Sequence, residues 1–520
     1  MRLTPMSMVG GIAGVALAAL IFYTSCESRE HRKERIARMY CGQCHVFPEP
    51  ELLDRKTWIE SVLPLMAFHM GATNNSRVLL TIDPGDIDYV LSALPSRFIA
   101  SDEEWQAIRE YYFKHAPDSL TITHPVIDDT LSWFHASSLK NTFEPHVTFL
   151  RYDTVRRELY AGTRYQDFFT FDSRLERIDS IKLSSPPSWM EWDDGQVLLT
   201  TMGIMDPNDR PAGRVVSVKG NKEITLIDSI KRPVYFEHED LNGDGVSDLV
   251  VCGFGNYTGH LSVYDGHNNA EHVLSATPGA RKTIVRDVNR DGRPDILALF
   301  AQGDERIVSY TNRGNFSFDE TILLRFSPVD GTSYFEIADF NGDGHFDILV
   351  TNGDNADYSP IIKPYHGVTI YENDGENVFT ERWSFPMPGA SMAMARDFDN
   401  DGDLDIAAIS FFPDFQRTPD RSFLYFENNG AYDFKPHRLP AATLGRWLVM
   451  EAADYDNDGD IDLVLGANNF GGMGAGSDDY SYWNANRTAL LFLENTSVTK
   501  RPDLSDQSDA SADSSSPTGK

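Results

Sequence analysis

Basic residues are scarce in this chain. Of its 520 residues, 46 are Lys or Arg and 78 are Asp or Glu, which gives a formal net charge of −32. So acidic a chain would repel a phosphate backbone, and the composition therefore argues against nucleic acid as a partner. A hydrophobic content of 41% still suffices for a large core and a second, smaller domain.

Cysteine is also rare, with four residues in the whole chain. Two of them form the pattern C-x-x-C-H at Cys41, Cys44 and His45, and no second Cys pair exists to complete a zinc site. This pattern is the attachment motif of c-type haem, in which both thiols form thioethers and the adjacent His binds iron. A redox-active C-x-x-C is the alternative, but the His directly after the motif favours haem. Cys252 is expected to be a small buried hydrophobe.

The apolar run Met8–Tyr23 is short for a membrane span and is soon followed by Cys26. With Arg2 in front of it, the run fits an export signal, and export provides the compartment in which c-type haem is attached. The segment resembles a bacterial lipoprotein signal, although Tyr23 stands where that motif usually has Leu. The resemblance implies a lipid on Cys26 and a place at the outer membrane or facing the periplasm of a bacterium. An uncleaved N-terminal anchor is the alternative.

A nine-residue pattern, D-x-[ND]-x-D-G-x-x-D, occurs five times, and an apolar, strand-like segment follows each copy. We call the copies acidic loops 1 to 5; they span residues 240–248, 287–295, 339–347, 397–405 and 454–462. Oxygen donors at positions one, three, five and nine can converge on one hard cation, since the Gly at position six permits a sharp reversal. Calcium is the expected occupant. The predicted ligands are Asp240, Asn242, Asp244, Asp248, Asp287, Asn289, Asp291, Asp295, Asp339, Asn341, Asp343, Asp347, Asp397, Asp399, Asp401, Asp405, Asp454, Asp456, Asp458 and Asp462.

The loops lack the bidentate Glu that an EF-hand carries at position twelve. Apolar residues stand there instead: Val251, Ala298, Val350, Ala408 and Leu465. The Asp at position nine is therefore expected to close the site, with the metal in a turn between two β-strands. Turns rich in Asp, Asn and Gly that hold no ion are the alternative.

The loops begin 47 to 58 residues apart, a period that indicates stacked supersecondary units. Each unit fits a strand, the acidic loop and further strands, as in a four-stranded propeller blade. The sequence here resembles the FG-GAP or VCBS repeat family, which also forms the propellers of integrin alpha-subunits, and the resemblance covers about residues 146–498. Two upstream periods, at about 148–183 and 188–230, lack the ligand set. We therefore predict a mainly β fold with a seven-bladed propeller; six or eight blades remain possible.

A small all-α domain is expected before the propeller. Glu30–Tyr40 fits a helix that leads into the haem motif, and Ser101 with Glu104 forms a capping box that begins another. Tyr111, Tyr112 and Phe113 of this second helix are expected to pack on the rest of the domain. Between them lies V-L-P-x-M, which is similar to the segment after C-x-x-C-H in cytochrome-like domains fused to such propellers. This resemblance to cytochrome c implies Met66 as the sixth iron ligand, and Met70 and His69 remain alternatives.

The expected organisation is a signal or anchor at 1–26, a haem domain at 27–117 and a linker at 118–145. The propeller follows at 146–498, and a tail at 499–520 is expected to be disordered. Residues 131–134, inside the linker, are expected to supply a strand that closes the propeller ring.

Two functions from different classes fit these features. In the first, a membrane-tethered monohaem protein transfers single electrons, and the calcium-stabilised propeller is a docking or ligand-binding platform for an unidentified redox partner or extracellular ligand. In the second, the propeller binds glycans or mediates adhesion and the haem is auxiliary. A further alternative is a propeller dehydrogenase that feeds the haem. No catalytic constellation is evident in the repeats, so electron transfer is favoured over substrate turnover.

Overall fold

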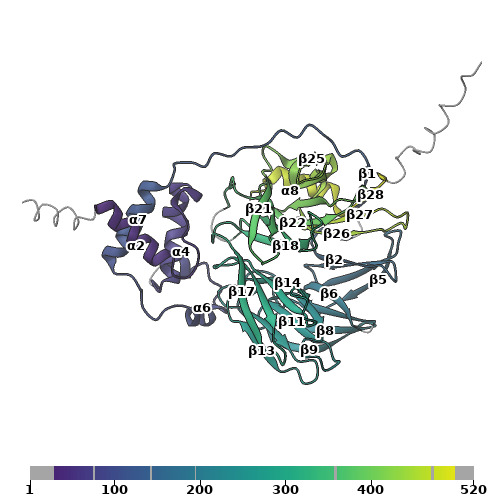
Figure 1. The fold of residues 1–520 in the computed structure, drawn as a ribbon, viewed down its shortest axis with the longest axis horizontal. Coiled ribbons are helices and arrows are strands. Elements are labelled where there is room, and N and C mark those ends of the chain that lie inside the picture. Colours follow the sequence, from purple (N-terminus) through teal and green to yellow (C-terminus); the bar gives the residue numbers. More distant parts are fainter. Residues whose placement is uncertain are drawn as a thin grey trace, which may run out of the picture.

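Seven four-stranded antiparallel sheets form most of the protein. They are arranged around a common axis as the blades of a β-propeller, with a group of helices at one side (Figure 1). The structure, a computed structural model, describes residues 28–73, 76–140, 143–193, 195–356, 360–469 and 474–497. The expected export signal with Cys26 and the expected tail at 499–520 lie outside these residues.

The first four blades follow the chain from the innermost to the outermost strand. They comprise β2 (Val147–Asp153), β3 (Glu158–Thr163), β4 (Asp167–Phe171) and β5 (Arg177–Lys182); β6 (Pro187–Asp193), β7 (Gln196–Thr201), β8 (Gly213–Lys219) and β9 (Lys222–Ile230); β10 (Pro233–Glu239), β11 (Asp248–Gly253), β12 (His260–Tyr264) and β13 (Glu271–Ser275); and β14 (Ala280–Arg286), β15 (Asp295–Phe300), β16 (Arg306–Asn312) and β17 (Phe318–Arg325).

The remaining three blades repeat this order. They comprise β18 (Thr332–Ala338), β19 (Asp347–Asn352), β20 (Gly367–Asn373) and β21 (Phe379–Pro386); β22 (Ala390–Arg396), β23 (Asp405–Ser410), β24 (Phe423–Asn428) and β25 (Phe434–Arg438); and β26 (Trp447–Ala453), β27 (Asp462–Ala467) and β28 (Thr488–Asn495) with β1 (Phe134–Lys140). The predicted seven-bladed propeller is confirmed, and the two upstream blades lie at the predicted periods.

Strand β1 closes the ring, because it comes from upstream of blade 1 and pairs antiparallel with β28 of blade 7. The strand begins at Phe134, inside the segment that the sequence indicates as a linker. Leu131 lies before it, is buried, and donates its backbone N–H to the Arg438 carbonyl at 3.0 Å. Closure leaves only the short outer edges of each blade exposed.

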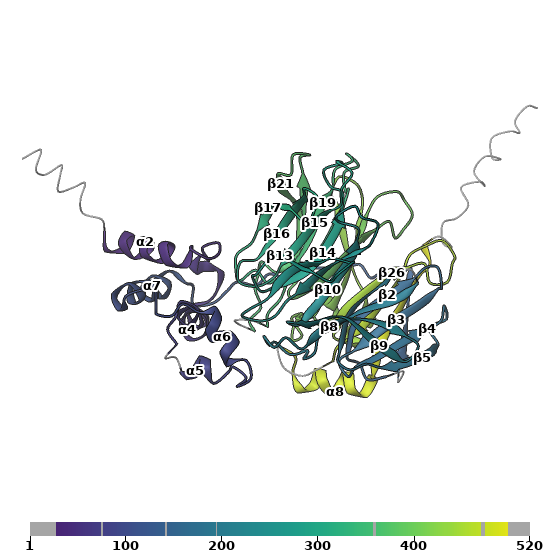
Figure 2. The same cartoon turned by 90° about the horizontal axis from the view of Figure 1, so that it is seen from below.

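The helical domain consists of short helices beside the propeller (Figure 2). They pack around a main apolar cluster, which includes Trp58 and Tyr112, and a smaller one of Phe68, Val78 and Val90. Its elements are α2 (Arg29–Cys41), a 3-10 turn (Pro50–Leu52), α3 (Arg55–Thr57), a π-helical turn (Trp58–Val62), α4 (Leu63–His69), α5 (Ser76–Leu79), α6 (Ile87–Ala93) and α7 (Asp102–His115). The expected capping box forms: Glu104 N–H donates to Ser101 Oγ at 3.3 Å, and Ser101 N–H donates to Glu104 Oε2 at 2.9 Å. In the described part of the chain, no helix is both long and apolar enough to cross a membrane.

The end of α7 shows where its aromatic residues pack. Tyr111 and Tyr112 are buried in the apolar cluster, as expected from the sequence, and Trp58 packs on Tyr112 with ring centroids 4.5 Å apart. Phe113 is 59% exposed, so the expectation that it packs into the domain is wrong. One residue further along a helix turns the side chain by about 100°, and this places Phe113 beside the Arg55 guanidinium instead.

The helical domain packs against loops of blades 2 to 5. Tyr365 Oη donates to the Leu52 carbonyl at 3.1 Å, and Val329 belongs to the apolar cluster of the helical domain. Arg210 pairs with Asp83 at 2.7 Å and with the buried Asp86 at 3.1 Å. Apolar packing and ion pairs therefore both connect the two parts.

The two ends of the blades differ in what they carry. In an antiparallel blade, the turn between strands one and two lies at the opposite end from the turn between strands two and three. The five acidic loops join strands one and two, whereas the helical domain contacts later turns, for example at Tyr257 and Tyr365. The acidic loops and the helical domain thus occupy opposite faces of the propeller.

Every innermost strand has a register shift between its first and third residues. Such a bulge re-aims the residues that follow it. The fourth residue of every innermost strand is buried. Because successive side chains of a strand point to opposite sides, the third and fifth residues lie on the other side of the strand, toward the propeller axis. We call them the axis residues: Phe149, Trp189, Tyr235, Lys282, Tyr334, Met392 and Val449 in the first layer, and Arg151, Glu191, Glu237, Ile284, Glu336, Met394 and Glu451 in the second.

Glutamates among the axis residues connect neighbouring blades. Glu237 accepts the Val285 N–H at 2.6 Å, Glu336 accepts the Ala395 N–H at 2.8 Å, and Glu451 accepts the Tyr152 N–H at 3.0 Å. In each case the donor belongs to the innermost strand of the next blade. The last of these bonds joins blade 7 to blade 1.

Replacing Glu451 by Ala should weaken the closed ring. The substitution leaves the buried Tyr152 N–H without its acceptor, which costs about 1–3 kcal/mol. The denaturant midpoint of propeller unfolding should fall accordingly, whereas Glu239→Ala, at an exposed position of an innermost strand, should change the unfolding free energy by less than about 0.5 kcal/mol. Equal midpoints for the two variants would contradict a role for Glu451 in closure.

Candidate functional site

A cavity of about 280 Å³ lies between the helical domain and the propeller. Cys41, Cys44 and His45 line it from the helical side, and Pro328 and Val329 line it from the propeller. The three residues of the C-x-x-C-H motif thus face one common space. The propeller forms part of its wall.

The His45 ring is oriented by a hydrogen bond. Its Nδ1 lies 2.8 Å from the Val46 carbonyl oxygen, which can only accept, so Nδ1 carries the proton. The lone pair is therefore on Nε2, the state in which imidazole binds a metal. Burial lowers the pKa of His45 and keeps the ring neutral.

The two motif cysteines are free thiols in different surroundings. Cys41 is half-buried beside Tyr112, and burial raises the pKa of its thiol to about 12, whereas Cys44 is exposed. Neither is in a disulfide, so both remain able to form thioethers. Cys252 in β11 is fully buried, as expected for a small core residue.

All three candidates for the sixth iron ligand line the same cavity: Met66, His69 and Met70. Met66 packs with Cys41 against the core of the helical domain. His69 stacks on Tyr257 of the propeller with ring centroids 5.2 Å apart, and burial lowers the pKa of His69 to about 4. The geometry thus brings motif and candidates together, and the choice of Met66 stays a prediction.

These residues fit a haem group. The cavity offers two thiols, a neutral imidazole with a bare Nε2, and a second side with thioether and imidazole donors. Most of the other lining side chains, including Trp58, Val62 and Leu63, are apolar, as a porphyrin face requires.

The five acidic loops share one backbone conformation. The Gly at position six has φ between +84° and +103° in every loop, in the left-handed region that the sequence argument requires. The Asp at position one accepts N–H groups from positions five and six, for example from Asp343 at 3.1 Å and Gly344 at 2.8 Å in loop 3. Oxygen atoms of positions one and three consequently turn toward the inside of each loop.

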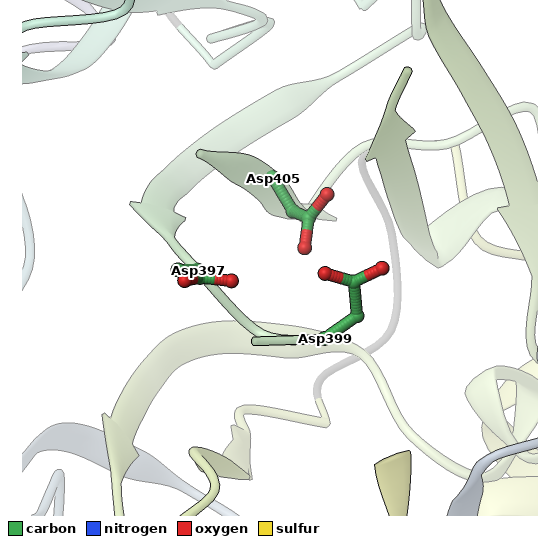
Figure 3. Close-up of side chains that lie close together, drawn as sticks. All are labelled: Asp397, Asp399 and Asp405. Atoms are coloured by element: carbon green, nitrogen blue, oxygen red, sulfur yellow. The ribbon is translucent and has the colours of Figure 1, made fainter. Parts of the chain in front are cut away.

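Loops 4 and 5 gather the most negative charge. In loop 4, carboxylate oxygens of Asp397, Asp399 and Asp405 lie within 4.8 Å of one another and point toward a common centre (Figure 3). In loop 5 the close group consists of positions one, three and five instead: Asp454, Asp456 and Asp458. Three carboxylates this close repel one another unless a cation lies between them, which fits a calcium site.

The Asp at position nine has a second role that the sequence argument did not anticipate. It is fully buried in all five loops and accepts two backbone N–H groups. In loop 3, Asp347 accepts from Phe340 within the loop at 3.0 Å and from Asn373 at the end of the third strand at 2.9 Å. Burial raises the pKa of Asp405 and of Asp462 to about 7. This carboxylate ties the loop to the blade besides facing the predicted metal.

Loop 2 differs from the other acidic loops because it contains two arginines, Arg290 and Arg293. Arg293 donates to Asp291 Oδ2 at 2.5 Å, and Arg290 reaches across to the Gly344 carbonyl of loop 3 at 2.7 Å. The guanidinium group therefore already neutralises one predicted ligand of loop 2.

The axis residues are functional candidates that the sequence argument missed. A signal exists for part of them: Glu237, Glu336 and Glu451 each stand three residues before the first Asp of an acidic loop. No such sequence signal marks Lys282, because the side of the strand on which its side chain lies depends on the bulge in β14.

Three segments of the chain, residues 240–298, 287–350 and 397–465, match a family of FG-GAP-like repeats. These segments are FG-GAP-like repeats. Together they contain all five acidic loops, each with the strand that follows it. Among curated proteins, none is significantly similar to the chain.

Three solved structures are similar to the chain at low identity. The WD40 domain of Neurospora crassa Pan2 is 11% identical, with a TM-score of 0.42 over 71% of this chain and 97% of that one. The N-terminal domain of Nup159 is 11% identical, with a TM-score of 0.40 over 72% and 98%. BBS1N, solved in complex with ARL6DN, is 9% identical, with a TM-score of 0.44 over 70% and 97%.

Calcium should matter more in loop 4 than in loop 2, and the fifth position allows a matched test. With calcium at about 100 times its dissociation constant, a site contributes about 2.7 kcal/mol to folding. Asp401→Ala should lose much of this free energy, while Asp291→Ala should lose less, since Arg293 already pairs with Asp291. In chelator, Asp401→Ala should be neutral or stabilising, because it removes repulsion.

Thermal unfolding of both variants, with calcium and with chelator, measures these differences. Equal losses for the two variants in calcium, or an equally large loss for Asp401→Ala in chelator, would contradict a stronger calcium site in loop 4.

Proposed function

We propose that this chain is an exported, membrane-tethered, monohaem c-type electron-transfer protein. One observation supports this most: the C-x-x-C-H residues and the candidate axial ligands Met66, His69 and Met70 line a single cavity. This cavity therefore contains the thiols and the iron-ligand atoms that a c-type haem needs. Haem bound there would supply a one-electron redox couple.

Different residues of the chain would attach the haem, orient its iron ligand and exclude water from it. Cys41 and Cys44 would hold it covalently, and the Val46 carbonyl would keep His45 oriented with Nε2 toward the iron. The apolar wall, which includes Val329 of the propeller, would exclude water. In this proposal the propeller contributes directly to the surroundings of the haem.

The propeller would be a platform stiffened by calcium in its FG-GAP-like repeats. Its acidic loops lie on the face away from the helical domain, so their proposed metal would stabilise the platform without contacting the haem. A lipid on Cys26 would hold the helical domain close to the membrane, since α2 begins at Arg29, with Ser28 as its N-cap. The redox partner would then approach near the membrane surface.

The purified chain should carry one covalently attached haem after expression with a cytochrome c maturation system. Denatured protein should keep haem peroxidase staining, because thioether bonds survive denaturation. Cys41→Ser combined with Cys44→Ser should abolish the stain, and Cys252→Ser should retain it, since Cys252 is buried in β11. Unstained wild-type protein from the same expression would end this proposal.

Replacing Met66 by Ala should change the haem absorption spectrum and lower its reduction potential, because Met ligation raises the potential of c-type haem. Potentiometric titration of Met66→Ala, Met70→Ala and His69→Ala measures the effect. If Met66→Ala leaves both properties unaltered and Met70→Ala or His69→Ala changes them, the assignment of Met66 is wrong.

A further inference from the structure

Most of the axis residues have charged or aromatic side chains, which we call the belt, and four are apolar: Met392, Val449, Ile284 and Met394. Arg151 Nη2 lies 3.3 Å from Glu191 and its guanidinium lies 5.2 Å from the Trp189 ring centroid. Trp189 packs on Tyr235 with centroids 4.6 Å apart. Trp189, Tyr235, Lys282 and Tyr334 are half-buried, whereas the residue that follows each of them is buried, so solvent reaches the side of the strands that faces the axis.

The carboxylates of the belt are already satisfied. Glu237 accepts from Tyr235 Oη at 3.0 Å in addition to Val285 N–H. Glu336 accepts from Ala395 N–H and pairs with Arg396 at 2.9 Å. Glu191 accepts from Arg151 and from Trp189 Nε1 at 3.0 Å, and Glu451 accepts from Tyr152 N–H.

Lys282 differs from Arg151 of the belt and from Arg396 beside it, which both pair with a glutamate. Its Nζ lies 3.7 Å from the Tyr334 ring centroid, and among the described residues no carboxylate oxygen lies within 4.0 Å of it. A partly buried ammonium that only a ring face contacts retains donors for a ligand, and its charge is not neutralised at contact distance. Arg151 offers a further donor to a ligand, because its buried Nε has no hydrogen-bond partner among the described residues.

We propose that the propeller axis binds a small organic carboxylate, with Lys282 as its anchor. The carboxylate would pair with the Lys282 ammonium, a charge-assisted contact that the belt itself does not supply. The faces of Trp189, Tyr235 and Tyr334 would contact a flat, apolar remainder of the ligand. Lys282 belongs to blade 4, whose later turns contribute Gly303 and Asp304 to the cavity beside the helical domain. Binding at the axis does not require haem.

The surroundings of Lys282 set the pH dependence of binding. It faces Glu237 from β10, Glu336 from β18, Arg396 from β22 and Arg151 from β2. Burial lowers the pKa of Lys282 to about 8 and raises the pKa of Glu237 to about 7. As pH rises from 6 to 9, Glu237 gains negative charge and Lys282 loses positive charge, so both changes weaken the binding of an anion.

Isothermal titration of the full-length protein with benzoate, acetate and inorganic phosphate tests the proposal. Benzoate should bind saturably and more tightly than acetate, and more weakly at pH 9 than at pH 6. Lys282→Met should weaken benzoate binding by about tenfold or more, the loss expected for a charge-assisted hydrogen bond. Lys222→Met, at an exposed position in β9, should not change it, and Lys282→Arg should preserve it.

A second measurement uses the wild-type protein and does not depend on a folded variant. Acetylation at pH 8, followed by mass spectrometry of peptides, gives the modification rate of each lysine. Benzoate should slow acetylation of Lys282 and leave Lys222 unchanged. Absence of saturable benzoate binding, equal binding by wild type and Lys282→Met, phosphate binding without carboxylate binding, or unprotected Lys282 would each overturn the proposal.

Discussion

A buried carboxylate at position nine of each acidic loop is the contact on which the five blades with these loops depend. Asp347 and its four equivalents accept one N–H from their own loop and another from the end of the third strand, so one side chain holds three segments of a blade. Burying a charge requires compensation, which here comes from these donors and, in our proposal, from a cation at the loop centre. The acidity of the chain is therefore largely a feature of its architecture.

This arrangement separates the two faces of the propeller. One face carries the acidic loops; the other carries the turns that receive the helical domain and form one wall of the cavity at Val329. Between the faces, the innermost strands present glutamates that accept hydrogen bonds from the next blade. They also present Lys282, which contacts the Tyr334 ring and pairs with no carboxylate of the described residues. The carboxylates that hold the fold together and the ammonium group that remains available to a ligand thus lie in different parts of the propeller.

Much of this could be predicted from the sequence, because the decisive signals are local. The D-x-[ND]-x-D-G pattern fixes a turn and the strands beside it, and C-x-x-C-H places three cavity residues within five positions. The direction of Lys282 could not be predicted, since a bulge in β14 shifts the alternation of side chains. The part of the cavity wall at Val329 could not be predicted either, because it comes from a turn nearly 300 residues beyond the haem motif.

Calorimetry of the haem-loaded full-length protein, with the haem absorption spectrum recorded alongside, tests the separation of the two faces most directly. In chelator, we expect the propeller transition to move to lower temperature while the haem spectrum stays the same, because the helical domain contains none of the acidic loops. A propeller transition that chelator leaves unchanged, or a haem spectrum that changes together with it, would contradict a structural metal face and a separate redox face.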